Sequence, residues 1–361
     1  MLDTELTRLL QLRRPIVLAP MGGGPTTPEL VGAVTEAGGL GMFAATGLPP
    51  EGLRDAIAAI RGQTDGPFGV NWLIAPPASG GDIETVQAAL DPLRAELGLP
   101  PGQREVTLPP SALPDQIEVA LSAGVRVMSF ALGDPSSFVE PAHESGALVS
   151  AMVTTVDEAI RVADAGVDFV VAQGAEAGGH RSTFELGPGL EPALVGTIAL
   201  VPQVVDAVPV PVVASGGIVD GRGLAAALAL GAAGAQLGTR FLLAREAGTA
   251  PAYRAALVRA VETDTIVTTQ FTGRPARSIR NRFVERLSEV EPLPWPLQRF
   301  AAEDIYAAGF ARGDADLIPL LAGQGLRGLR DGQPAAEIVD EIAEQAEAVL
   351  RALASPSSPS S

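Results

Sequence analysis

The sequence predicts an α/β protein built on a (β/α)8 TIM barrel that carries a helical second lobe or lid. One phrase recurs along the chain: an alanine-rich helix is stopped by a glycine and followed at once by a short apolar strand. Its copies occupy residues 36–43, 122–128, 164–170 and 230–237, with a weaker copy at 144–149. Apolar strands placed directly after helices are typical of a parallel sheet buried on both faces.

The second observation is the number of strand candidates, which is eight. Eight strands separated by helices of about 10–15 residues fit a (β/α)8 barrel. A doubly wound open sheet is the alternative, but it requires a different segmentation and usually fewer strands. In chain order, the expected strands are residues 16–20, 41–45, 68–71, 126–130, 148–151, 169–173, 212–215 and 235–237.

Two segments do not belong to a simple barrel. The first is an insertion rich in Pro and Gly with one amphipathic helix near 83–97, and the second contains its best helices at 304–310 and 335–353. The expected division of the chain is 1–75 (barrel strands one to three), 76–114 (the insertion, an element of a lid), 115–264 (strands four to eight with a phosphate site), 265–354 (a mainly helical second lobe) and 355–361 (a disordered tail).

Composition restricts the function classes. The chain has 361 residues and a formal net charge of −17, which argues against nucleic acid or an anionic membrane as a partner. It has no cysteine, which excludes disulfides, cysteine-ligated metal sites and a cysteine nucleophile, and we expect no metal site. The first fifteen residues lack the apolar core of a secretory signal, so a cytoplasmic location is expected. The sequence leaves a homodimer open.

The most informative stretch is residues 170–182, which reads VVAQGAEAGGHRS. An apolar run ends in Gln173, and small residues including Gly178 and Gly179 lead to His180, one of only two histidines in the chain. Glycines remove side chains where a flat ligand can lie against the backbone, and a histidine there can move protons near neutral pH. The alternative is a tight strand-to-helix turn whose histidine caps a helix or binds water.

A phosphate site is predicted after the last two strands. Glycine-rich turns with free N–H groups form anion sites, and TIM barrels often bind phosphate at these two positions. The alternative is that the glycines only tighten ordinary turns. The residues concerned are Ser215, Gly216 and Gly217 after strand seven, and Gln236, Leu237, Gly238 and Thr239 at the end of strand eight.

Other strand ends also carry polar or special residues. Met21 and Gly22 follow strand one, Asn71 ends strand three, and Gln173 ends strand six. Amide side chains can hydrogen-bond the edge of a flavin's pyrimidine ring, which offers alternating donors and acceptors. Met21 could instead be core, whereas an Asn at the end of an apolar strand needs a polar partner.

Together these motifs resemble the nitronate monooxygenases, formerly called 2-nitropropane dioxygenases. The similarity extends from about Pro15 to Gln324. The stretches that carry it are residues 19–23, 173–181, 200–208, 215–223, 236–241, 272–277, 313–316 and 322–324.

The resemblance implies an enzyme that uses FMN and molecular oxygen to oxidise alkyl nitronates, or nitroalkanes, to a carbonyl compound and nitrite. His180 matches the family's active-site histidine. The alternatives are an enoyl-acyl-carrier-protein reductase that uses FMN and NADH, and a flavin-binding protein without this activity. The positions that match flavin-binding residues are Asn71, Gln173, Gly178, Gly217, Gln236, Leu237, Gly238 and Thr239.

The chain departs from the family pattern at Trp72, Ser182 and Ser215, and we expect these changes on the substrate side. The insertion and the C-terminal segment are expected to cover the flavin as a lid, leaving an apolar pocket beside His180. Trp72 would narrow that pocket if it points inward. His143 is predicted to lie on a helix surface.

Overall fold

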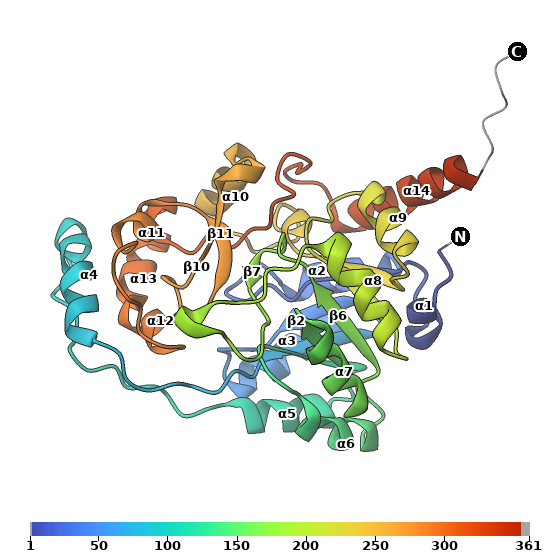
Figure 1. The fold of residues 1–361 in the computed structure, drawn as a ribbon, viewed down its shortest axis with the longest axis horizontal. Helices are drawn as coiled ribbons and strands as arrows, with labels where there is room; N and C mark the ends of the chain where they lie inside the picture. Colours follow the sequence, from blue (N-terminus) through green and yellow to red (C-terminus); the bar gives the residue numbers. More distant parts are fainter. Residues whose placement is uncertain (1, 355–361) are drawn as a thin grey trace, which may run out of the picture.

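Eight parallel strands form a nearly closed barrel in the computed structural model, which describes residues 2–354 (Figure 1). The predicted tail at 355–361 lies outside the described residues. In chain order, the barrel strands are β1 (Ile16–Leu18), β2 (Gly41–Ala44), β3 (Phe68–Leu73), β4 (Val127–Ala131), β5 (Leu148–Val153), β6 (Phe169–Gln173), β8 (Val212–Ser215) and β9 (Gly234–Leu237).

The order of the strands confirms the predicted TIM barrel. It runs β1-β9-β8-β6-β5-β4-β3-β2, with every neighbouring pair parallel. A parallel bridge between Val17 and Leu40 brings β1 next to the start of β2, which nearly completes the ring. All eight predicted strands are present, and the largest differences are that β3 and β5 each extend two residues further than expected and β1 ends two residues earlier.

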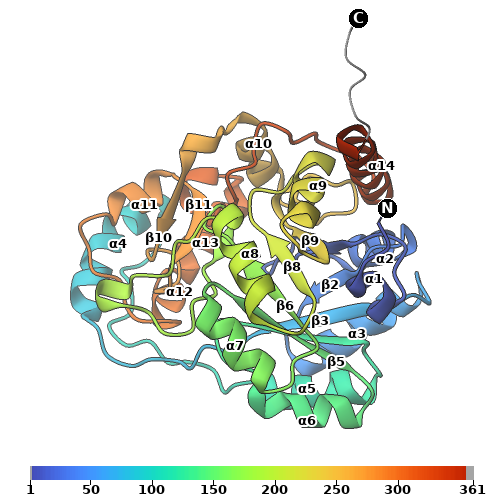
Figure 2. The same ribbon diagram turned by 45° about the vertical axis from the view of Figure 1, so that its right-hand side comes forward.

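Helices cover the outside of the barrel (Figure 2). Their starts follow local sequence signals: Thr27, Thr155 and Asp220 each accept a hydrogen bond from a backbone N–H of the first helical turn. These outer helices are α2 (Pro28–Glu36), α3 (Pro50–Arg61), α5 (Leu113–Ser122), α6 (Ser136–Glu144), α7 (Val156–Asp164), α8 (Thr197–Ala207), α9 (Gly221–Ala229) and α14 (Ala335–Ala354).

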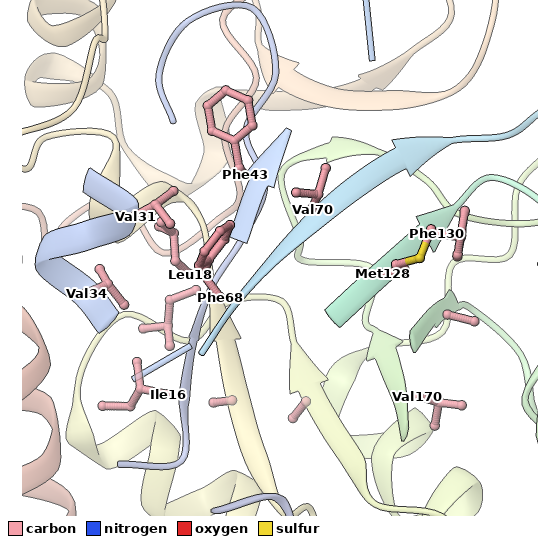
Figure 3. Close-up of a cluster of buried hydrophobic side chains, with 14 of the residues drawn as sticks. Ile16, Leu18, Val31, Val34, Phe43, Phe68, Val70, Met128, Phe130 and Val170 are labelled. Carbon is pink, nitrogen blue, oxygen red and sulfur yellow. The ribbon is translucent and has the colours of Figure 1, made fainter. Parts of the chain in front are cut away.

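Strand side chains divide into two apolar layers because successive residues point to opposite faces. Leu18, Val70 and Val170 belong to the core shared with the outer helices, which Figure 3 shows around Val31 and Val34 of α2. The opposite faces of the strands form an inner core. Helix α1 (Glu5–Leu10) contributes to it. The inner core contains Leu6, Leu10, Val17, Met42, Val127, Phe169, Val171 and Val213.

Helix α14 corrects the predicted extent of the second lobe. We expected residues 265–354 to form one helical lobe, but α14 packs against α9 and α2 of the barrel. Ile338, Val339 and Ile342 join the core between strands and helices, and Gln345 accepts a hydrogen bond from the N–H of Gly221 at 2.8 Å. The apolar stripe of α14 therefore completes the helical layer of the barrel, and the second lobe ends before it.

The insertion and the segment after the eighth barrel strand share one core (Figure 1). The predicted helix α4 (Ile83–Leu97) has the expected bounds, and its Val86 and Leu90 pack with aromatic residues from residues 271–306. Arg94 of α4 pairs with Asp304 at 2.7 Å across this contact. The helices of the C-terminal segment are α10 (Pro251–Arg259), α11 (Arg282–Arg286), α12 (Leu297–Ala301) and α13 (Glu303–Arg312).

The second lobe also contains a small sheet that the sequence did not predict. Strands β10 (Thr265–Thr268) and β11 (Ala276–Ile279) form an antiparallel pair, and β11 pairs in turn with β7 (Gly179–His180). Because β7 follows directly after barrel strand β6, the lobe is joined to the barrel at the carboxyl ends of its strands. Within residues 2–354, every helix is too short or too polar to cross a membrane.

Candidate active site

The second lobe holds the backbone of His180 in place. Ala276 of β11 is the strand partner of His180, and the next residue, Arg181, donates its N–H to the carbonyl of Pro275 at 2.8 Å. Gly179 has a φ of 80°, a conformation that L side chains rarely adopt, and a Cβ at this position would meet nothing within 4 Å. The sequence-predicted glycine is therefore needed for the turn that presents His180.

Gln173 fixes the same loop from the barrel side. Its Nε2 donates to the carbonyl of His180 at 2.9 Å, and its Oε1 accepts from the N–H of Ser182 at 2.9 Å. Gln173 is buried at the end of β6. Its amide, which we expected to read the edge of a flavin ring, already uses one donor and one acceptor to position the histidine loop.

Arg181 is a second anchor, and it is fully buried. Its guanidinium donates to the carbonyls of Gly174 at 2.7 Å, Gln173 at 2.9 Å and Ala193 at 3.3 Å. Burial lowers the pKa of Arg181 to about 10, and the positive charge of Arg277 adds to the shift, so the group stays charged at neutral pH. Arg181 thus stabilises the carboxyl end of β6 beneath His180.

His180 is a partly buried residue, and its ring has two neighbours from the second lobe. Its Nε2 lies 2.9 Å from Oγ1 of Thr272, and its ring meets the indole of Trp295 edge-on at a centroid distance of 5.1 Å. Burial lowers the pKa of His180 to about 4, and the positive charge of Arg274 contributes to the shift. His180 is therefore a neutral imidazole at physiological pH.

A proton titration of His180 tests this state directly. His143→Asn leaves His180 as the single histidine, so its ring signals can be followed by NMR. We expect the ring to stay at least about nine-tenths neutral down to pH 5, because its folded pKa lies below the ordinary value of 6.5. A midpoint above about pH 6 would contradict this assignment.

Polar side chains line the upper interior of the barrel. Asn71, Ser129 and Ser150 are in register on β3, β4 and β5, and Asn71 donates to Ser129 at 3.1 Å. Ser215 and Gln236 are in register on β8 and β9. All five are buried. Within residues 2–354, Oγ of Ser150 and Nε2 of Gln236 have no hydrogen-bond partner, so this interior retains buried donors.

The loops after β8 and β9 present backbone donors. Among the described residues, the N–H groups of Gly216, Gly217 and Gly238 have no backbone acceptor, and all three residues are at least partly exposed. Thr239 is committed elsewhere, because its Oγ1 accepts from the N–H of Gly323 at 2.9 Å. Leu237 points outward into the helix layer, so only its backbone faces these loops.

Near the same loops, Met21 and Gly22 lie at the carboxyl end of β1. Met21 is partly buried between two apolar clusters, and its N–H donates to Oγ1 of Thr26 at 2.8 Å, whereas Gly22 is exposed. Gly178, which we expected to bind flavin, also has a packing role. A Cβ on it would lie 2.4 Å from the backbone nitrogen of Gly323, so this glycine allows residues 322–323 to pack against the loop.

Two residues that depart from the family pattern do not lie where we expected them. Trp72 faces away from the barrel interior: its Nε1 donates to Gln116 of α5 at 3.1 Å, and its ring stacks on Phe130 at 5.5 Å. Ser182 is fully buried, where its Oγ donates to the carbonyl of Met152 and accepts from the N–H of Leu132. Neither lines the substrate side, while Ser215 does face the barrel interior.

These features agree with comparisons to known proteins. A model of the family described as nitronate monooxygenase matches residues 4–345. The chain belongs to the nitronate monooxygenase family. A probable nitronate monooxygenase of Staphylococcus aureus (strain MSSA476) is 39% identical over 352 residues, which cover 96% of this chain and 98% of that relative.

Solved structures extend the likeness of this nitronate monooxygenase family member. A nitroalkane oxidase from Streptomyces ansochromogenes superimposes with a TM-score of 0.89 at 38% identity, covering 96% of this chain and 99% of its own. FabK from Thermotoga maritima gives a TM-score of 0.76 at 32% identity, covering 98% of both chains. The family match confirms the predicted resemblance and shows that the protein is an oxidoreductase.

Sequence reasoning about this family member missed Trp295 and gave Thr272 no role of its own. Both contact His180, although they follow it by 115 and 92 residues along the chain. Thr272 opens a stretch that carries the family resemblance, and that position was an available signal. Trp295 stands in a Pro-rich loop outside any motif, so only the folded chain reveals its contact with the histidine.

Proposed function

We propose that the protein binds FMN at the carboxyl ends of the barrel strands and uses molecular oxygen to oxidise alkyl nitronates to a carbonyl compound and nitrite. The observation that supports this most directly is a neutral, positioned His180 beside a barrel interior with unpartnered buried donors. The nitroalkane oxidase named above acts on related compounds, which agrees with this substrate class.

The residues present fit FMN. The free N–H groups of Gly216, Gly217 and Gly238 would hold its phosphate, since backbone donors at such turns bind anions. Nε2 of Gln236 and the amide of Asn71 would face its ring system from the barrel interior. Gly179 leaves open space beside His180. When bound, FMN supplies the electron transfer between the nitronate and oxygen.

His180 then acts on the substrate through its imidazole. Thr272 Oγ1 can accept from the Nε2–H of His180 while donating to the carbonyl of Arg274, which lies at 3.3 Å. This arrangement leaves Nδ1 of His180 as the atom that accepts or holds a proton. The imidazole is neutral without substrate, and an anionic nitronate beside Nδ1 would raise its pKa and favour proton uptake there.

Flavin analysis tests the cofactor. We expect the denatured protein to release FMN in near-stoichiometric amount, because the site offers backbone donors for one phosphate group. The measurement is chromatography of the released flavin against FMN and FAD standards. Release of FAD, or a protein that takes up no flavin on reconstitution, would contradict the proposal.

An anaerobic titration tests the reaction on the same preparation. Propionate 3-nitronate should bleach the flavin absorbance, and oxygen should then restore it with formation of nitrite. A parallel sample receives NADH. Bleaching by NADH alone would favour the enoyl-acyl-carrier-protein reductase reading, and bleaching by neither compound would favour a flavin-binding protein without this activity.

A further inference from the structure

An apolar cluster lies at the carboxyl ends of the strands on the side where Trp295 meets His180. The buried guanidinium of Arg274 lies at its edge, where it donates to the carbonyl of Leu132 at 3.4 Å. We call this cluster the apolar wall, and its members are Leu73, Ala75, Ala131, Leu132, Met152 and Trp295.

Three members of the apolar wall keep accessible surface. Ala75, Ala131 and Leu132 are buried, whereas Leu73, Met152 and Trp295 are only partly buried. Leu73 lies two residues after Asn71 on β3, and Met152 lies two residues after Ser150 on β5. Residues two apart on a strand share a face, so both side chains point into the mouth of the barrel.

Trp295 comes to the wall from the second lobe. Its carbonyl accepts the N–H of Ala78 at 2.8 Å, which ties it to the insertion, and its ring contacts His180 at a centroid distance of 5.1 Å. Leu293, two residues earlier, is buried in the core of the second lobe. The indole is therefore held from the lobe side and packs against the same buried residues as Leu73 and Met152.

The backbone of the wall is also held in a costly conformation. Leu132 has a φ of 69°, which is rare for a residue with a branched side chain, and Oγ of Ser182 accepts its N–H at 3.0 Å. The buried Ser182 thus helps place Leu132 next to the inward-facing residues. Non-glycine residues with a positive φ persist only where the surrounding structure holds the backbone in that conformation, and such residues cluster at ligand sites.

We propose that Trp295 closes the apolar wall and sets the upper length of the substrate's carbon chain. The substrate is then an aliphatic anion whose charged end lies at His180 and whose chain runs along Leu73 and Met152 toward the indole. This inference rests on the proposed function for the identity of the anion. The role that the sequence suggested for Trp72 belongs to Trp295, the other tryptophan of the chain.

Relative rates along a homologous series test the limit. We compare kcat/KM for the nitronates of nitroethane, nitropropane, nitrobutane and nitrohexane in the wild type and in Trp295→Ala. Each additional methylene that enters an apolar site is worth roughly a fourfold gain. We therefore expect the ratio of the longest to the shortest substrate to rise by about tenfold or more in Trp295→Ala. An unchanged ratio would overturn the proposal.

Two further variants control for folding. Trp72→Phe changes the buried tryptophan on the outer face of β3 and should leave the chain-length ratio at the wild-type value. Trp295→Phe retains a ring, and it should shift the ratio less than Trp295→Ala does. Trp295→Phe and the binding experiment below decide the matter if Trp295→Ala cannot be purified. The proposal is then overturned if the chain-length ratio is unchanged in Trp295→Phe and the fluorescence of Trp295 does not respond to the anions.

A binding experiment separates this inference from the reaction. In Trp72→Phe, Trp295 is the only tryptophan, so its fluorescence reports on the wall alone. Titration of the flavin-loaded protein with butanoate and octanoate, as unreactive aliphatic anions, should change this signal saturably. A response without nitronate turnover would refute the proposed function and retain the aliphatic site. The role of Trp295 would be refuted if the enzyme turns over nitronates, the fluorescence of Trp295 does not change with the anions, and the chain-length ratio is the same in Trp295→Ala as in the wild type.

Discussion

Replacing His180 by asparagine should lower kcat on nitronates by about 10²-fold or more, the effect of removing an acid–base group, while FMN remains bound. Asparagine retains a polar side chain that can reach Thr272, but it has no atom that takes up a proton. The backbone of the loop should stay in place because Gln173, Arg181 and β11 hold it through main-chain groups.

The measurement is steady-state oxygen uptake together with the flavin absorbance of the purified variant. His143→Asn is the matched control: His143 lies exposed on α6, where its Nε2 pairs with Asp168 at 2.9 Å. That variant should keep wild-type kcat. Unchanged turnover in His180→Asn would remove its catalytic role, and loss of flavin from His180→Asn would make the residue structural.

The barrel could be predicted because its signals are local. In five βα units a glycine follows the helix and an apolar strand begins two or three residues later, and both features are visible in a window of about ten residues. Residues 164–173 illustrate this: Gly166 ends α7, and β6 begins at Phe169 as predicted. The positions of chemical groups at the carboxyl ends of the strands then follow from the fold itself.

Contacts between distant segments could not be predicted in this way. The hairpin of β10 and β11 pairs with β7 across almost one hundred residues, and no short window contains both partners. The sequence predicted a helix at residues 335–353, which is α14. Its packing against α9 depends on which part of the barrel surface the other helices leave uncovered. The position of Trp72, in contrast, was available from strand alternation, because a residue next to an inward-facing Asn71 must point outward.

The glycines near His180 show a further limit of sequence reasoning. A glycine can make room for a ligand or for the chain's own backbone, and the residue type is the same in both cases. Gly179 leaves open space, whereas Gly178 makes room for residues 322–323. Only the position of residues 322–323 in the folded chain shows which glycine makes room for backbone and which leaves space for a ligand.

Replacing Arg181 by methionine should destabilise the protein and loosen the histidine loop. Methionine fills a similar volume but donates no hydrogen bond, so the carbonyls of Gln173 and Ala193 lose this donor, while that of Gly174 keeps only the N–H of Ala177. An unsatisfied buried polar group costs about 1–3 kcal/mol. We therefore expect the free energy of unfolding to fall by roughly 3 kcal/mol or more, since no solvent reaches this side chain to replace the lost donors.

Thermal and urea unfolding of the flavin-loaded variant measure this loss. Arg222→Met is the matched control, because Arg222 is exposed at the start of α9 and, within residues 2–354, its side chain pairs only with Asp220 two residues away. Its midpoints should equal those of the wild type, as expected for an exposed ion pair. Arg181→Met should also lower kcat/KM, because Arg181 and Gln173 anchor the loop that carries His180 and the loss of one anchor should loosen it. Wild-type midpoints in Arg181→Met would show that the buried guanidinium is dispensable, and the anchoring of His180 would then rest on Gln173 and β11.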